Sequence, residues 1–369
     1  MKLKKKNCAI ALVILLIIIF EFINPIKLIS SNALKQLNYS SKSSKTIIEL
    51  GIKKQVLEHE YSEFVDKNVQ SKHFDVENYD IYKQLVYNES FNEIVIVNKL
   101  IDKGYNVEEI NCIIKTGDID SANQLLEKEK YEYLVDFLCY DYAKLKNLDR
   151  YIDYQMNTLS SYEETVLFIE LDLDKDVYTD YNVITNFSFD MLVNKHNQLS
   201  KDFEPKDLVK VDNNYSVSDD NYGNRTMLEN FYKMADELNK ELDLNIYIRS
   251  AYRTYESQED VYEQYLKAYG EKYVKEYVAY PGFSEHQTGL SVDIKASSSN
   301  TFANTKEAKW VKENAYKYGF IERYTKKLEN ITGYQSELWH YRYVGVEIAT
   351  YIKEHNISFD EYYVKFLNK

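Results

Sequence analysis

Three residues with metal-binding side chains lie in two short segments of the C-terminal part of this chain. His286 and Asp293 are seven residues apart, with Gly289 between them, and His340 follows in the second segment. Imidazole nitrogen and carboxylate oxygen are donors that zinc accepts, and three protein ligands leave a fourth position open for water. Gly289 allows the tight turn that would bring His286 back beside Asp293. The pattern predicts a catalytic site for one zinc ion, and hydrolysis as the class of reaction.

Glu337 precedes His340 by three residues. The two are too close for Glu337 to be a further ligand from the same strand face. A carboxylate at this position is well placed to take a proton from a zinc-activated water and to pass it to a leaving amine. We therefore predict Glu337 as the general base. The alternative is a surface glutamate in a salt bridge.

Arginine is concentrated where these residues lie. Five of the six arginines come after residue 220, in a chain that otherwise uses lysine, and only arginine offers a planar, bidentate fork. Arg253 is predicted to bind a substrate carboxylate or to stabilise a developing oxyanion, which makes it both a catalytic and a substrate-binding candidate. Gln258 and Ser284 are candidates for holding the substrate's backbone or carboxylate.

Four further residues of this region are expected to be structural. Arg249 and Arg323 are assigned to the scaffold, and Trp339 is expected to pack in the core beneath the site. Arg342 is assigned in the same way, although it lies close to His340 in the sequence.

The C-terminal region alternates helical and strand patterns without regular strand–helix–strand units. Such a pattern indicates an α+β domain, here a small antiparallel sheet with flanking helices that carries the zinc site. Expected helices span residues 227–242, 255–268, 306–318 and 346–355, and expected strands span residues 245–250, 290–294 and 339–344.

Apolar residues three and four apart recur through the preceding region, interrupted by short turns. This periodicity predicts an all-helical region at residues 46–190, whose biochemical role the sequence does not indicate. A small solenoid with units of 30 to 40 residues is one interpretation. Residues 26–45 are rich in Ser, Lys and Asn and are expected to be a linker. Cys112 and Cys139 are expected to be free thiols, with a single disulfide as the alternative.

The N-terminal 25 residues combine a basic start with an apolar run. Four lysines among residues 2–6 precede an uncharged segment at residues 8–20, which is typical of a signal peptide or a short signal anchor. The run is shorter than an ordinary spanning helix, which favours cleavage. The small-residue site at residues 31–33 lies far from it, which favours an anchor. We expect export, with the protein held on the outer face of the cytoplasmic membrane by this segment, or secreted if the segment is cleaved.

The charge of the chain argues against one class of partner. Lys and Arg total 46 against 59 Asp and Glu, a net charge of −13, which disfavours a phosphate backbone. No nucleic-acid partner is expected.

Taken together, these segments resemble the zinc D-alanyl-D-alanine carboxypeptidases of the vancomycin-resistance type, in the fold group of lysostaphin-like peptidases and hedgehog amino-terminal domains. The resemblance covers residues 191–369. It is carried by the segments Ser250–Thr254 with Gln258, Tyr280–Gly289 with Asp293, Tyr318–Tyr324, Ile331–Tyr334 and Glu337–Gly345. One departure is Leu338, where the family often has proline.

At the matching positions the resemblance implies zinc ligation by His286, Asp293 and His340. It also implies Glu337 as the base, and Arg253, Gln258 and Ser284 as substrate contacts. The implied reaction is removal of the terminal D-alanine from peptidoglycan stem peptides. The alternatives are an L,D-carboxypeptidase or a D,D-dipeptidase acting on wall peptides, and a non-catalytic wall-binding module in which zinc is structural.

Overall fold

The computed structural model describes residues 32–368. They form two compact units, divided between Glu163 and Glu164. The predicted signal or anchor segment, residues 1–25, lies outside the described residues, as do residues 26–31 of the predicted linker. Within residues 32–368, no helix combines the length and apolar character that a membrane span requires.

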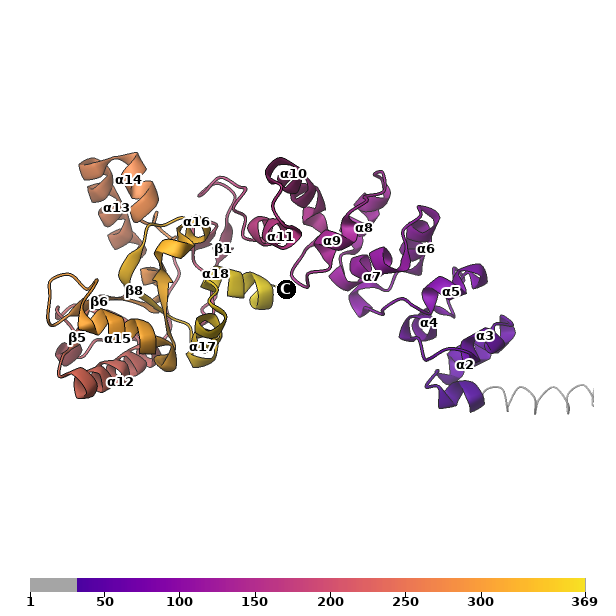
Figure 1. The fold of residues 1–369 in the computed structure, drawn as a ribbon, viewed down its shortest axis with the longest axis horizontal. Helices are drawn as coiled ribbons and strands as arrows, with labels where there is room; N and C mark the ends of the chain where they lie inside the picture. The colour runs from indigo at the N-terminus through magenta and orange to yellow at the C-terminus, as the bar shows by residue number, and fades with distance from the viewer. Residues whose placement is uncertain (1–31, 369) are drawn as a thin grey trace, which may run out of the picture. The chain divides into compact units, whose positions relative to one another are not determined.

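The first unit consists of short helices joined by turns, as the sequence predicts. Figure 1 shows them following one another in chain order. They are α2 (Ser41–Glu49), α3 (Lys53–Leu57), α4 (Glu63–Asn68), α5 (Tyr79–Tyr82), α6 (Ile94–Asp102), α7 (Val107–Thr116), α8 (Ile119–Leu126), α9 (Leu134–Leu138) and α10 (Leu148–Thr158), with 3-10 turns at Val76–Asn78, Glu89–Phe91 and Leu145–Asn147. The next helix, α11 (Tyr162–Glu170), spans the division, and between it and residue 190, the predicted limit of the helical region, the structure has turns and one strand but no helix.

Helices of the first unit contact their successors at a short, regular sequence offset. Hydrogen bonds join Val86 N to Asn111 Oδ1 and Lys103 Nζ to Leu126 O, 25 and 23 residues apart. In stacked helical repeats, each unit contacts only the units next to it. The spacing is shorter than the 30 to 40 residues of the solenoid interpretation. Cys112 is buried, Cys139 is exposed and both are free, as expected.

The second unit is an α+β domain, as predicted. Its strands are β1 (Asn182–Ile184), β2 (Asn197–Leu199), β3 (Leu208–Lys210), β4 (Tyr222–Asn224), β5 (Ile246–Ser250), β6 (Ser291–Ala296), β7 (Phe320–Tyr324) and β8 (Glu337–Tyr343). Its helices are α12 (Arg225–Leu242), α13 (Tyr255–Tyr269), α14 (Glu271–Tyr277), α15 (Lys306–Asn314), α16 (Glu329–Thr332), α17 (Val346–His355) and α18 (Phe359–Tyr362), with 3-10 turns η4 (Asn213–Tyr215), η5 (Glu285–Thr288), η6 (Ala315–Tyr318) and η7 (Lys326–Leu328), and a π-helical turn η8 (Tyr363–Leu367).

A four-stranded antiparallel sheet forms the centre of this domain, in the order β5-β6-β8-β7. Alternate residues of a strand face opposite sides of a sheet. Val292, Ile294 and Tyr341 therefore share one face, and they pack with apolar residues of α12 and α15 in the main core. Asp293 and His340 alternate with these residues and lie on the opposite face. The core thus fixes which face carries the chemistry.

Two interruptions of the strand ladder shape the sheet next to the site. On β7 the step from Glu322 to Tyr324 is two residues, whereas their partners on β8, Tyr341 and Glu337, are four residues apart. The ladder between β5 and β6 also shifts, between Ile248 and Ser250. Such bulges bend a strand and turn side chains away from the regular alternation.

Candidate active site

His286 is positioned by the short turn η5, which Gly289 ends. Gly289 has φ of +70°, a left-handed conformation that glycine adopts without steric cost. The Nδ1 atom of His286 lies 2.6 Å from the carbonyl oxygen of Ala251. A carbonyl oxygen only accepts hydrogen bonds, so we assign the ring proton to Nδ1. The lone pair of Nε2 is then left for a metal ion.

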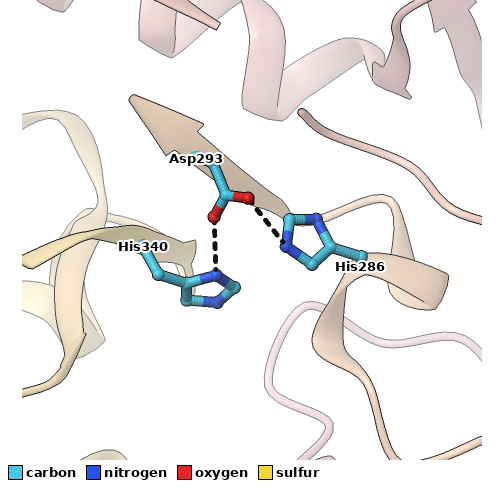
Figure 2. Close-up of side chains that lie close together, drawn as sticks. All are labelled: His286, Asp293 and His340. Carbon is cyan, nitrogen blue, oxygen red and sulfur yellow. Dashed lines mark hydrogen bonds and ion pairs between the residues drawn. The ribbon is translucent and has the colours of Figure 1, made fainter. Parts of the chain in front are cut away.

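Asp293 and His340 are direct partners across β6 and β8. Figure 2 shows the Asp293 carboxylate between the two imidazoles. Asp293 Oδ1 lies 3.1 Å from His340 Nδ1, and Oδ2 lies 3.5 Å from His286 Nε2. One donor atom from each of the three residues lies within 4.8 Å of the others. The structure therefore brings together the three predicted ligands, and this donor set fits zinc.

Glu285 is a part of this site that the sequence analysis did not assign. Its side chain is fully buried, and Oε2 lies 3.1 Å from His340 Nε2. A carboxylate at this position accepts the Nε2 proton, which leaves Nδ1 of His340 as the metal-binding atom. The sequence does place an acidic residue directly before His286. This position alone does not predict a role in the site, because most acidic residues are exposed.

A buried ion-pair network holds Glu285 in place. Arg323 donates from Nε to Glu285 Oε1 at 2.8 Å and from Nη1 to Asp360 Oδ2 at 2.6 Å, while Arg342 Nη1 lies 3.5 Å from Glu285 Oε1. Burial alone would raise the pKa of Glu285, but Arg323, His340 and Arg342 outweigh it and hold the pKa well below its ordinary value. Arg323 and Arg342 are thus structural, as expected, and they act on the site through Glu285.

The charges around the candidate ligands favour ionised Asp293. Burial opposes the charge, but His286 and His340 outweigh burial and lower the pKa of Asp293. At His286, burial is the largest influence and lowers the pKa. At His340 burial is outweighed by hydrogen bonds to Asp293 and Glu285, which raise its pKa to about 9. A carboxylate and two imidazoles in such contact would ligate a divalent cation in exchange for protons.

Glu337 lies at the start of β8, beyond the bulge, and lines the same cavity as the three candidate ligands. Burial is the main influence on its carboxyl group and raises the pKa of Glu337 to about 7, although His340 and Arg253 oppose the rise. Regular alternation would put Glu337 on the same face as Tyr341, against the core. The bulge gives a physical reason why it instead borders the cavity.

Arg253 follows β5 and is fixed from three sides. Its backbone N–H donates to the carbonyl of His286 at 3.2 Å, and its guanidinium donates to Gln258 Oε1 at 2.8 Å and to Ser250 Oγ at 3.2 Å. Gln258 Nε2 in turn donates to the carbonyl of Ala279 at 2.7 Å. Burial lowers the pKa of Arg253, while Asp293 and Glu337 counteract this effect. The guanidinium group of Arg253 is therefore oriented before a substrate binds.

A cavity of about 420 Å³ unites the predicted residues. Its lining includes all seven of them, namely Arg253, Gln258, Ser284, His286, Asp293, Glu337 and His340. Ser284 is buried, and within residues 32–368 its hydroxyl has no hydrogen-bond partner. One expectation was wrong: Trp339 is 39% exposed and lines the cavity rather than packing in the core. Arg249 also lines the cavity, and its structural role stays a prediction. Trp339 lies within the bulged part of β8, where alternation does not predict burial.

Comparison with known proteins gives the family. Residues 220–346 match the model of the family VanY, D-alanyl-D-alanine carboxypeptidase. The bifunctional D-Ala-D-Ala dipeptidase and carboxypeptidase VanXYC of Enterococcus gallinarum is 32% identical over 180 residues, which cover 47% of this chain and 92% of VanXYC. The chain belongs to the VanY family.

Other relatives share only part of their length with this VanY-family chain. YodJ of Bacillus subtilis (strain 168) is 40% identical over 182 residues, 47% of this chain and 66% of YodJ. A D-alanyl-D-alanine carboxypeptidase of Enterococcus faecalis (strain ATCC 700802 / V583) is 40% identical over 124 residues, 31% of this chain and 46% of that enzyme. Among solved structures, the L,D-carboxypeptidase LdcB is 37% identical, with a TM-score of 0.47 over 52% of this chain and 94% of LdcB.

Proposed function

We propose that this protein is a zinc-dependent carboxypeptidase that removes the terminal D-alanine from peptidoglycan stem peptides. The observation that carries the proposal is one cavity containing three convergent metal-binding side chains, a buried carboxylate and a pre-oriented arginine. Family membership supports the substrate class, because the matching family is that of D-alanyl-D-alanine carboxypeptidases. His286, Asp293 and His340 would hold the ion.

A bound zinc ion would supply Lewis acidity, which acidifies water and polarises the scissile carbonyl. Glu337 takes the proton of the attacking water on its carboxylate and delivers it to the departing amine of D-alanine. Its pKa of about 7 suits both steps, because the group can lose and regain a proton near neutral pH. The mechanism therefore assigns Glu337 the proton transfers.

Substrate binding falls to Arg253, Gln258 and Ser284, which line the same cavity. The fork of Arg253 matches a terminal carboxylate and fixes the end of the peptide. Gln258 holds Arg253 in place, since its amide oxygen accepts from Arg253 and its amide nitrogen donates to the carbonyl of Ala279. Ser284 offers a buried hydroxyl to the peptide or its carboxylate. An arginine that binds the terminal carboxylate would select peptides with a free C-terminus.

The decisive experiment is turnover of a pentapeptide ending in D-Ala-D-Ala by the purified full-length protein, before and after treatment with a chelator. Release of one D-alanine that stops on chelation and returns with zinc is expected. Turnover that persists without metal would contradict the mechanism. Mass spectrometry of products from a tetrapeptide, a pentapeptide and free D-Ala-D-Ala separates this activity from L,D-carboxypeptidase and D,D-dipeptidase action.

We further propose that residues 1–25 direct the protein out of the cytoplasm and retain it as an anchor on the outer face of the membrane. The basic residues and the apolar run at residues 8–20 support this placement. Fractionation of cells is expected to find the protein in the membrane fraction, accessible to external protease. If the protein is released into the medium with a processed N-terminus, residues 1–25 are a cleaved signal peptide and not an anchor.

A further inference from the structure

Four tyrosines form a stack on the helices α13 and α14, which lie side by side as a hairpin (Figure 1). We call Tyr265, Tyr269, Tyr273 and Tyr277 the tyrosine ladder. Tyr273 occupies its middle, with ring centroids 4.6 Å from both Tyr269 and Tyr277 and 6.1 Å from Tyr265. The planes of Tyr273 and Tyr277 are 19° apart, so these rings are stacked.

The ladder is open to solvent rather than part of a core. Tyr269 is 62% exposed, Tyr277 41% and Tyr265 40%. Within residues 32–368, none of the four hydroxyls has a hydrogen-bond partner among the protein groups. Contiguous exposed aromatic surface is uncommon on soluble domains and marks binding sites.

Ordinary helix stabilisation explains only part of this arrangement. Pairs four residues apart, such as Tyr265 with Tyr269, support a helix by a few tenths of a kcal/mol, roughly 0.2–0.5. The stack, however, continues across Gly270 from α13 into α14. It ends at the catalytic cavity, which Tyr265, Tyr273 and Tyr277 line together with the candidate zinc ligands.

The proposed function sets the direction of the substrate and places its sugar farther from the candidate zinc ligands than its C-terminus. A carboxypeptidase holds the C-terminal end of its peptide beside the metal and Arg253, so the other end leaves through the cavity mouth. In peptidoglycan that other end is attached to an amino sugar of the glycan strand. The C–H groups on the flat face of a pyranose ring pack against the electron-rich face of an aromatic ring, and free phenol hydroxyls match sugar hydroxyls and acetamido groups.

We propose that the tyrosine ladder is a binding site for the N-acetylated amino sugars of the glycan strand that carries the stem peptide. The inference rests on the proposed function, which sets the order in which the peptide and the sugar lie along the cavity. Tyr269 lies outside the cavity lining and is the most exposed ring of the four. Substitution of Tyr269 therefore tests sugar binding with the least disturbance of the catalytic residues.

The test compares two substrates of the full-length protein: a free stem pentapeptide, and the same pentapeptide attached to its N-acetylated disaccharide. The ratio of their kcat/KM values measures the contribution of the sugar. We expect the wild-type ratio to exceed one and Tyr269→Ala to lower it by about fivefold, the order of one lost aromatic contact. Tyr269→Trp, which keeps an aromatic surface, should preserve the ratio. Tyr222→Ala, at an exposed tyrosine on β4 outside the cavity lining, is the matched control and should not change it.

Binding of peptide-free glycan fragments, followed by NMR titration, separates this inference from the proposed function. Fragment binding that is weakened by Tyr269→Ala supports the ladder, even if wild-type protein cleaves no peptide. An unchanged substrate ratio together with unchanged fragment binding overturns the inference, even if the free pentapeptide is cleaved. A dimer in sedimentation that Tyr269→Ala disrupts, without any effect on sugar, would assign the ladder to a second copy of the chain and also overturn it.

Discussion

Each histidine of the candidate zinc site binds a protein group through one ring nitrogen and would offer the other to a zinc ion. The partners differ: His286 has the carbonyl of Ala251 and His340 has the carboxylate of Glu285. A charged partner makes an imidazole a stronger donor than a neutral one does. The two candidate ligands are therefore not equivalent, and the scaffold would act on a bound metal ion through Glu285.

Replacing Glu285 should weaken metal binding. We expect Glu285→Gln to lower zinc affinity by about 10- to 100-fold, because His340 loses its charged partner. Competition with a chromogenic chelator measures this affinity. The matched control is Glu307→Gln, since Glu307 is equally buried but binds the Ser297 and Ser298 hydroxyls away from the site. Equal zinc affinity for the two variants would show that Glu285 only stabilises the fold.

Replacing the proposed base should remove turnover and leave the metal in place. Glu337→Gln is expected to reduce kcat by roughly 10²- to 10⁴-fold, the contribution typical of general acid–base catalysis. Zinc content by atomic absorption should stay at the wild-type level. Glu322→Gln is the control, because burial also raises the pKa of Glu322, on β7, outside the catalytic cavity. Full activity of Glu337→Gln would refute its role.

The same residue predicts how activity depends on pH. Glu337 is active as the carboxylate, so activity should be lost as pH falls through its pKa. Burial raises that pKa to about 7, and the positive charge of zinc would lower it again. We expect an acidic limb in kcat/KM with a midpoint between about pH 5 and about pH 7. A flat profile from about pH 5 to about pH 8 would exclude Glu337 as the titrating base.

Among the secondary-structure elements, those with strong local signals were predicted well. Helix α17 has the predicted bounds, and β5 and β6 differ from prediction by one or two residues at their ends. Helix α7 begins with a capping box formed by Asn106 and Glu109, a signal that is local in the sequence. The predicted helix at residues 306–318 is α15 followed by the 3-10 turn η6.

Features that depend on tertiary pairing were not predictable from local patterns. The bulge that places Glu337 and exposes Trp339 arises from the pairing of β7 with β8. The buried position of Glu285 depends on Arg323, 38 residues later in the chain. The stacking of the tyrosine ladder depends on the turn at Gly270. The four tyrosines are four residues apart in the sequence, but the helix is interrupted between Tyr269 and Tyr273, so this spacing alone does not predict a stack that continues from α13 into α14.

The turn that carries His286 gives a prediction at its last residue. Gly289→Ala should both destabilise the protein and weaken zinc binding, because the left-handed conformation costs a residue with Cβ about 1–2 kcal/mol. The same substitution at Gly104 is a matched control: its φ is +86°, and an added Cβ would meet nothing within 4 Å. Gly104→Ala should lower Tm but leave zinc affinity unchanged. Unchanged zinc affinity in Gly289→Ala would show that the turn does not position His286.

The division of the molecule into two compact units predicts that they unfold separately. Ile113 is fully buried in the helical unit and Val311 in the core of the α+β domain. Truncation of either side chain to alanine should cost about 1–4 kcal/mol through lost burial and a cavity. In calorimetry, each substitution should lower the temperature of a different transition, and Ile113→Ala should leave kcat/KM on the free pentapeptide unchanged. A single transition lowered by both substitutions would mean that the helices and the catalytic domain fold as one cooperative body.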